Sequence, residues 1–307
     1  MSLKTTTKNI LLFPFNILYK ISPETDLKIL FYLKQKYKLN LKNPKTYNEK
    51  LQWIKLYDRN PLMPKCVDKF QVRKYVEEKG CSDILNELYW EGFNPEDIPY
   101  DKLPNQFVIK VTHGSTFNII VNDKNKLDKK QTEKTLKKWL KNKFIPCYGE
   151  WFYGVEKPRI VIEKYLETPG KKELMDYKIF CFNGKAKYVD VHSGRFGEHK
   201  RNVYDTNWNF QEDVYFKYNH DEIIEKPKNL EKLLMYAEKL SEDFLHARVD
   251  FYIIDDKIYF GEITFTNGAG FDNIKPYEFD LKMGEYLNLG KNKWFSKIKY
   301  IARLTSL

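Results

Sequence analysis

The order of hydrophobic and polar positions predicts helices in the first eighty residues of the chain. Apolar residues recur there at helical spacing, which predicts helices at 26–37, 46–57 and 68–80. Thr46 and Glu49 have the spacing of a capping box, which marks the start of the second helix. Gly80 ends the third helix, because glycine readily takes the left-handed conformation found after a helix.

From residue 107 onward, β-branched and aromatic runs predict strands mixed with helices. Asn183 and Gly184 can supply the two positive φ angles of a type I′ turn, so 176–191 is predicted to be a hairpin. Few strand-helix-strand units occur, and this pattern favours an α+β fold. The strands are expected at 107–111, 159–166, 176–182, 185–191, 247–254 and 258–265, and the helices at 129–144 and 229–244.

Composition and charge narrow the class of protein. Of the 307 residues, 42% are hydrophobic and 16% aromatic, which is ample for a folded core, and the net charge is +11. Lysines are spread evenly and no known nucleic-acid-binding motif occurs, so we expect no nucleic acid partner. The positive charge fits better with an enzyme that binds phosphates close to an anionic membrane.

The cysteines and the apolar N-terminal stretch bear on location. Cys66, Cys81, Cys147 and Cys181 are isolated, as expected of small hydrophobic residues in a reducing compartment. Residues 10–21 are too short to span a bilayer and contain Pro14, so we expect them to pack on the body of the protein. The alternative is a peripheral membrane contact. We expect a cytoplasmic protein, with contact at the inner face of the membrane as the alternative.

The final predicted hairpin carries acidic residues in alternation. Arg248 and Asp250 share a face of one strand, and Glu262 and Thr264 share a face of the next. Asp250 and Glu262 face the same side only if the loop has an odd number of residues, most simply 255–257. Two adjacent carboxylates need a cation, and oxygen ligands suit magnesium. An ordinary hairpin with exposed acids is the alternative, and it would be favoured if these residues stood alone.

Other segments have the chemistry of a nucleotide site. Lys110 ends an apolar strand ahead of a His-Gly-Ser sequence at 113–115, whose glycine lets backbone N–H groups approach a phosphate. Asp176 and Lys178 share a strand face and offer an acceptor for a ribose hydroxyl and a cation for phosphate. Residues 163–166 leave a buried strand with free backbone groups that suit a flat heterocycle. A solvated strand face and a plain strand end are the alternatives for these two segments.

Taken in order, these motifs resemble the ATP-grasp superfamily. Asp68-Lys69 before a helix, the 107–115 segment, 163–166 and 248–264 correspond to its motifs, and the last resembles the ArgxAsp…GluxAsn magnesium signature of the D-alanine ligase branch. Longer matches at 46–60, 103–114, 176–185 and 261–271 resemble the TupA-like ATP-grasp proteins, which are associated with bacterial cell-wall and capsular polysaccharide synthesis. This resemblance covers about residues 40–290.

The resemblance implies an ATP-grasp fold in which two α+β subdomains clasp ATP. They are expected at 105–166 and 167–292, after a mostly helical region at 1–104 and before a tail at 293–307. The implied cofactors are ATP and Mg²⁺. Thr264 stands where the family has asparagine, so it is the implied third metal ligand beside Asp250 and Glu262, with Asn267 or water as alternatives. The implied catalytic residues are Arg248 and Lys110, and the implied nucleotide contacts are Lys69, Lys110, His113, Gly114, Ser115, Glu163, Lys164, Tyr165, Leu166, Asp176 and Lys178.

The reaction implied is ATP-dependent ligation of a carboxylate to an amine through an acyl phosphate. The expected partners are ATP, an anionic sugar or polysaccharide precursor and an amino acid. A glycosyltransferase, the label this family often has, is one alternative, although no two aspartates here are separated by a single residue. A sugar or lipid phosphotransferase is another. Retention of Lys110, Arg248, Asp250 and Glu262 disfavours a third, a non-catalytic binding module.

Overall fold

The computed structural model describes residues 3–114, 117–167, 174–194, 198–216 and 222–291, and the tail predicted at 293–307 lies outside them. The predicted helices are present, and Thr46 and Glu49 form both hydrogen bonds of the capping box. The helices are α1 (Leu3–Ile21), α2 (Pro23–Gln35), α3 (Tyr47–Tyr57), α4 (Leu62–Val67), α5 (Gln71–Glu78), α6 (Lys129–Leu140), α7 (Leu230–Ser241) and α8 (Tyr277–Tyr286).

Two antiparallel sheets accompany these helices, so the α+β prediction is confirmed. A four-stranded sheet has the order β1-β4-β2-β3, and a five-stranded sheet has the order β7-β6-β5-β8-β9. The sequence patterns did not predict β1, β3 or β7, the last within the polar stretch after residue 192. The strands are β1 (Leu88–Gly92), β2 (Phe107–Val111), β3 (Asn118–Val121), β4 (Ile160–Lys164), β5 (Asp176–Phe182), β6 (Lys185–Ser193), β7 (Lys200–Asp205), β8 (His246–Ile254) and β9 (Lys257–Thr264).

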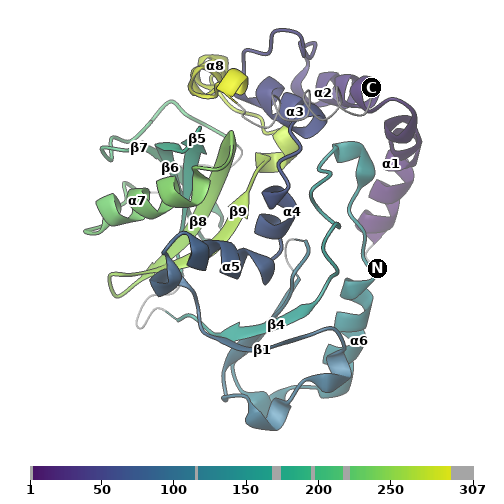
Figure 1. Ribbon diagram of the computed structural model, residues 1–307, viewed down its shortest axis with the longest axis vertical. Coiled ribbons are helices and arrows are strands. Elements are labelled where there is room, and N and C mark those ends of the chain that lie inside the picture. The colour runs from purple at the N-terminus through teal and green to yellow at the C-terminus, as the bar shows by residue number, and fades with distance from the viewer. Residues whose placement is uncertain (1–2, 115–116, 168–173, 195–197, 217–221, 292–307) are drawn as a thin grey trace, which may run out of the picture.

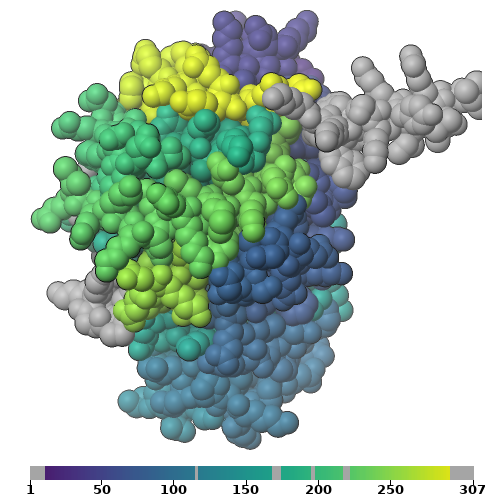
Figure 2. Space-filling view, turned by 60° about the vertical axis from the view of Figure 1, so that its left-hand side comes forward, coloured from purple at the N-terminus to yellow at the C-terminus, as the bar shows by residue number. Residues whose placement is uncertain are grey.

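Helices of the N-terminal half lie between and beside the two sheets. In Figure 1, α4 and α5 lie between the five-stranded sheet and the strands β1 and β4. Figure 2 shows the blue N-terminal segment lying directly against the green C-terminal half. Each sheet has its own apolar core, and the core of the five-stranded sheet includes side chains from α3, α4, α5 and α7.

Helix α3 holds the segment that follows β9. Gln52 donates to the carbonyl of Gly270 at 2.6 Å, and Lys55 donates to the carbonyl of Ala269 at 2.7 Å. The backbone N–H of Asn48 donates to the carboxylate of Asp280 on α8 at 3.0 Å. These bonds join α3 to groups that lie more than 200 residues later in the chain. The N-terminal helices therefore fix the backbone next to the end of β9.

The β5–β6 hairpin forms as predicted. Asn183 and Gly184 have φ angles of 48° and 77°, and β5 and β6 pair directly across them. The strand pair β5 and β8 then brings Lys178 opposite Asp250.

The predicted odd-length loop of the last hairpin is wrong. Ile254 pairs with Lys257, so only Asp255 and Asp256 form the loop, with φ angles of 48° and 61° that fit a type I′ turn. A β-bulge further along restores the parity: Phe251 pairs with Phe260, whereas Asp250 pairs with Glu262, and Gly261 is the extra residue. A Cβ atom at Gly261 would lie 2.9 Å from the carbonyl oxygen of Asp250, so the close backbone approach favours glycine.

Helix α1 packs against α2 and leaves part of its surface uncovered. The side chain of Asn16 accepts a hydrogen bond from the backbone of Cys147 at 3.0 Å, which ties α1 to the body as expected for residues 10–21. In the described part of the chain, no helix is long and apolar enough to cross a lipid bilayer. All four cysteines are buried, as predicted for small hydrophobic residues. The large apolar side chains exposed on α1 and α2 are Leu11, Phe13, Ile17, Ile21, Ile29, Tyr32 and Leu33.

Candidate active site

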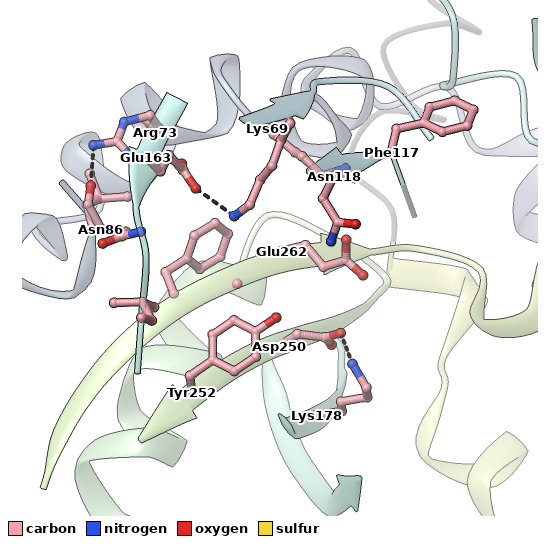
Figure 3. Close-up of a pocket in the computed structure, with 15 residues that line it drawn as sticks. Lys69, Arg73, Asn86, Phe117, Asn118, Glu163, Lys178, Asp250, Tyr252 and Glu262 are labelled. Carbon is pink, nitrogen blue, oxygen red and sulfur yellow. Dashed lines mark hydrogen bonds and ion pairs between the residues drawn. The ribbon is translucent and has the colours of Figure 1, made fainter. Parts of the chain in front are cut away.

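A pocket lies between the two sheets, and the predicted site residues that line it are Lys69, Lys110, Glu163, Leu166, Lys178, Asp250 and Glu262. Residues of β2 and β4 lie on one side of it, residues of β5, β8 and β9 on the other, and the start of α5 beside them (Figure 3). We call it the nucleotide pocket. Its lining residues are Lys69, Arg73, Leu85, Asn86, Lys110, Phe117, Asn118, Glu163, Leu166, Lys178, Asp250, Tyr252, Phe260, Gly261 and Glu262.

Asp250 lies at the centre of the polar face of the five-stranded sheet. Arg248 binds it with two hydrogen bonds, Nε to Oδ1 at 2.7 Å and Nη2 to Oδ2 at 2.8 Å, and Lys178 forms a further ion pair with it. Its side chain is only 3% exposed. Burial alone would raise the pKa of this carboxyl, but Arg248 and Lys178 hold the pKa below its usual range. Asp250 is therefore ionised at neutral pH.

Glu262 is the more accessible carboxylate of the pair. The bulge places it directly across from Asp250, and its side chain is 47% exposed. Arg248 lies 3.5 Å from its Oε1. Figure 3 shows Glu262 pointing from its strand toward Lys69 and Asn118, into the nucleotide pocket.

Both alternatives for a third metal ligand contact Arg248. The hydroxyl of Thr264 accepts a hydrogen bond from its Nη2 at 3.2 Å, and the side-chain oxygen of Asn267 accepts one from its Nη1. Neither residue lines the nucleotide pocket. Burial lowers the pKa of Arg248, but the charge of Asp250 outweighs it and raises the pKa above its usual value. Arg248 thus connects the carboxylates to the loop after β9 as a permanent cation.

Lys178 and Asp176 lie side by side on β5. The ammonium group of Lys178 is 3.5 Å from Oδ2 of Asp176, in addition to its contact with Asp250. Lys178 lines the nucleotide pocket, whereas Asp176 is buried beneath it and does not. The predicted shared face of the two residues is present.

On the four-stranded sheet, Lys110 of β2 and Glu163 of β4 form an ion pair diagonally across the two neighbouring strands. Lys110 Nζ is 2.6 Å from Oε2 of Glu163, and Arg73 of α5 lies 3.5 Å from its other oxygen. Arg73 also donates to the carbonyl of Asn86 at 2.8 Å. Two cations therefore share one carboxylate at this end of the pocket.

Lys69 fixes the loop that carries Gly114. Its ammonium group donates to the carbonyl of Gly114 at 2.9 Å, and its backbone N–H donates to the carbonyl of Thr112 at 3.4 Å. Burial lowers the pKa of Lys69. Gly114 has a φ of 84°, and a Cβ atom there would lie 2.9 Å from the ring of Phe117, so both conformation and space favour glycine. Ser115 lies outside the described residues.

Only part of the 163–166 segment, which was predicted to hold a flat heterocycle, lines the pocket. Glu163 and Leu166 line it, whereas Lys164 has an exposed side chain and Tyr165 is absent from the lining. The backbone carbonyl of Lys164 already accepts a hydrogen bond from the side chain of Asn86 at 2.8 Å. Asn86, which lies just before β1, therefore holds this segment in place.

His113 does not line the nucleotide pocket. Its Nε2 bonds the carbonyl of Asn142 at 2.9 Å, and the ring forms part of the wall of a different cavity. Gly114 is also absent from the pocket lining, and Phe117 and Asn118 are the residues after this glycine that line the pocket.

Sequence reasoning missed several pocket residues, among them Arg73, Asn86, Phe117, Asn118 and Tyr252. Tyr252 could have been found, because it continues the period of two set by Arg248 and Asp250. The others come from a helix face, a loop and a strand start that only the tertiary structure brings to the pocket.

The chemistry of the carboxylates fits magnesium. Asp250 is ionised, Glu262 is accessible, and both supply hard oxygen ligands on neighbouring strands. In the described ranges no three His, Cys, Asp or Glu side chains gather as a metal cluster. A small number of carboxylates is what magnesium requires when phosphates and water complete its coordination.

Comparisons with known proteins bear on the family. A family model described as TupA-like ATPgrasp matches residues 49–288, and no curated protein matches. Among solved structures, the D-alanine–D-alanine ligase of Bacillus anthracis complexed with ATP has 20% identity and a TM-score of 0.38, over 66% of this chain and 54% of that one. An L-amino acid ligase of Bacillus licheniformis has 14% identity and a TM-score of 0.45, over 73% and 49%. The chain thus spans about half the length of these two enzymes.

Proposed function

Because the chain belongs to the TupA-like ATP-grasp family, we propose that it is an ATP- and magnesium-dependent ligase that joins a carboxylate to an amine. One observation carries this proposal. Glu262, Asp250 and Lys178 lie next to one another on three adjacent strands, and they face Lys69 and Lys110 across a single pocket. Two acids and three cations in one pocket suit a nucleotide triphosphate with its metal.

The nucleotide is proposed to lie along the pocket with its adenine against the 163–166 segment. Leu166 and Tyr252 offer apolar surface there, and Asn86 fixes the backbone of that segment. Lys69, Lys110 and Lys178 would bind the phosphates at the other end. The ion pair between Lys110 and Glu163 is partly exposed, so Lys110 can turn to a phosphate at little cost.

Asp250 and Glu262 are proposed to hold magnesium, with Thr264 as a third ligand and Asn267 or water as its alternatives. The ion, when bound, supplies positive charge that neutralises the phosphate oxygens. Arg248 and Lys178 keep Asp250 ionised and oriented before any ligand arrives. Arg248 would stabilise negative charge on the transferring phosphoryl group, because it remains a cation at any physiological pH.

The proposed reaction has two steps. A carboxylate oxygen of the acceptor attacks the γ-phosphorus, and the bond from that phosphorus to the bridging oxygen of ADP breaks. The amine then attacks the carbonyl carbon of the acyl phosphate, inorganic phosphate leaves, and the amine loses a proton. The chain's part is to position the reactants and stabilise the charge.

The proposed substrates are an anionic sugar or polysaccharide precursor and an amino acid. The net charge of +11 supports an anionic acceptor and disfavours a neutral one. A peripheral contact with the inner face of an anionic membrane is proposed through α1 and α2, on which exposed apolar side chains lie among lysines such as Lys20, Lys28 and Lys34. Sedimentation with anionic vesicles, and loss of it in Leu11→Asp/Phe13→Asp, would test this contact; equal sedimentation of both proteins would refute it.

An assay of the products tests the proposed reaction. The protein is incubated with ATP and Mg²⁺, then with amino acids and uronic acids, and ADP, AMP and free phosphate are followed. Acceptor-dependent release of ADP together with phosphate is the expected result. Release of ADP without free phosphate would indicate a phosphotransferase instead. No ATP binding, together with turnover of a nucleotide sugar, would indicate a glycosyltransferase and refute the proposal.

A further inference from the structure

A second cavity lies beside the 140–158 segment and shares no lining residue with the nucleotide pocket. Its volume is about 720 Å³, which is within the usual range for small-molecule sites. It extends from Leu140, at the end of α6, to Pro158, shortly before β4, and Tyr19 of α1 lies on the other side. We call it the aromatic cavity.

Aromatic rings form much of its wall. Tyr19, Phe144, Trp151 and Tyr153 all line it. The rings of Phe144 and Tyr153 are stacked with their centroids 4.2 Å apart, so each supports the position of the other. Rings with apolar faces suit a ligand that has an apolar face of its own, such as the C–H face of a sugar ring.

Two buried polar atoms in the same wall have no hydrogen-bond partner among the residues that the structure describes. They are Nδ1 of His113 and Nε1 of Trp151. His113 is 7% exposed, and its Nε2 must donate to the carbonyl of Asn142, so its Nδ1 has a free lone pair. The indole N–H of Trp151 can only donate. Such unpaired atoms are costly in a folded protein, and hydroxyl groups of a ligand could satisfy both kinds.

The rim of the cavity is positively charged. Lys141 and Lys143 line it, have exposed side chains, and form no ion pair with any residue that the structure describes. Glu150 also lines it but is bound to the hydroxyl of Thr266 by a hydrogen bond of 2.5 Å. Burial raises the pKa of Glu150, and the charge of Lys55 opposes this shift. The rim therefore favours an anionic group.

The aromatic cavity adjoins the carboxylate end of the nucleotide pocket. Thr266, which binds Glu150, is two residues beyond Thr264 at the end of β9. The ring of Phe117, which lines the nucleotide pocket, has its centroid 5.9 Å from that of the His113 ring in the wall of the aromatic cavity. A ligand in the cavity would therefore lie on the side where the γ-phosphate is proposed.

We propose that the aromatic cavity is the acceptor subsite and that it binds an anionic saccharide. The sugar ring packs on Phe144 and the neighbouring rings, hydroxyl groups bind His113 and Trp151, and the carboxylate faces Lys141 and Lys143. The name acceptor subsite rests on the proposed ligase function, whereas saccharide binding can be measured without turnover.

Binding of glucuronate, followed by saturation-transfer NMR and titration in the presence of ADP and Mg²⁺, tests the proposal. Glucose serves as the neutral probe and glutamate as the anion without a sugar ring. Glucuronate should bind more tightly than either. Phe144→Ala should lower the affinity for glucuronate by about three- to tenfold, because one aromatic contact is lost. Lys143→Glu should weaken the binding of glucuronate but not the binding of glucose.

Lys134→Glu is the matched control, because it makes the same charge change on the exposed surface of α6, outside the cavity lining. It should leave glucuronate binding unchanged, and all three variants should bind ADP as the unmodified protein does. Absence of glucuronate binding, equal binding of glucuronate and glucose, or an equal effect of Lys134→Glu and Lys143→Glu would overturn the proposal. Failure of ADP to bind at all would instead count against the ligase function, so the two failures are distinguishable.

Discussion

The two sheets that face the nucleotide pocket hold their charged side chains in different ways. On the five-stranded sheet, Asp250 is 3% exposed and Lys178 7% exposed, and Asp250 is bound by cations from its own strand and from the neighbouring one. On the four-stranded sheet, Lys110 is 30% exposed, and its partner Glu163 is 10% exposed and also pairs with Arg73.

This difference indicates a division of labour within the pocket. Buried charges that satisfy one another are fixed by strand register, and removing one of them is costly. An ion pair whose lysine is partly exposed is worth less, and that lysine can exchange partners. The five-stranded sheet is therefore organised before a ligand binds, whereas the four-stranded sheet can adapt to the nucleotide.

The largest expected effect comes from removing one carboxylate charge on each sheet. Asp250→Asn should lower kcat about 1000-fold, because a metal ligand and the partner of two buried cations are lost together. Glu163→Gln should mainly raise the KM for ATP, since its contacts are made at the nucleotide end. Steady-state kinetics at several ATP and Mg²⁺ concentrations measures both. Equal losses of kcat in the two variants would contradict the division of labour.

The next effect should come from the bulge that aligns the carboxylates. In Gly261→Ala the new methyl group meets the backbone of Asp250, so Glu262 should shift and kcat should fall about 100-fold, as misplacements of about 1 Å can cause. Gly290→Ala is the control, because its Cβ would lie at an ordinary contact distance of 3.4 Å from the side chain of Asn288. A variant of Gly261 with normal magnesium dependence would show that the bulge does not position the site.

A smaller effect is expected on stability, where replacing Lys178 should destabilise the protein more than replacing Lys110. Lys178→Met should destabilise the protein by about 3 kcal/mol, because it leaves buried carboxylates with less compensation. Lys110→Met should change the free energy of unfolding by less than about 1 kcal/mol. Urea unfolding followed by circular dichroism compares them. Similar midpoints for the two variants would mean that the five-stranded sheet is no more dependent on its charges than the other.

The smallest expected effect is a pH dependence from the core of the five-stranded sheet. Burial lowers the pKa of His246 to about 3, and its ring bonds Cys181 and Tyr47. The unfolded chain takes up this proton near pH 6.5 and the folded one does not, so His246 reduces stability as the pH falls from about 6.5 toward 3, by up to about 1.4 kcal/mol per pH unit. Unfolding of the protein and of His246→Gln between pH 7.5 and 5 should show a flatter dependence in the variant. Parallel curves would exclude His246 as the cause.

Much of the fold was predictable because its signals are local. The capping box of Thr46 and Glu49 and the Asn183-Gly184 turn depend only on neighbouring residues, and both form as predicted. The strands β1, β3 and β7 were not predicted: all three are edge strands, each paired with one neighbour only, and the neighbour of β1 is the distant strand β4. The same holds for the site: alternation along β8 indicated Arg248 and Asp250, whereas Arg73 and Asn86 carry no local signal.

The sequence alone determined that Arg248 and Asp250 share one strand face and Glu262 and Thr264 another, because side chains alternate on a strand. It did not determine that these faces coincide. The loop has two residues, which by itself would turn Glu262 away, and the bulge at Gly261 reverses that outcome. Only the tertiary structure decides this, because a bulge is selected by how closely two backbones approach and by the side chains packed on both faces of the pair.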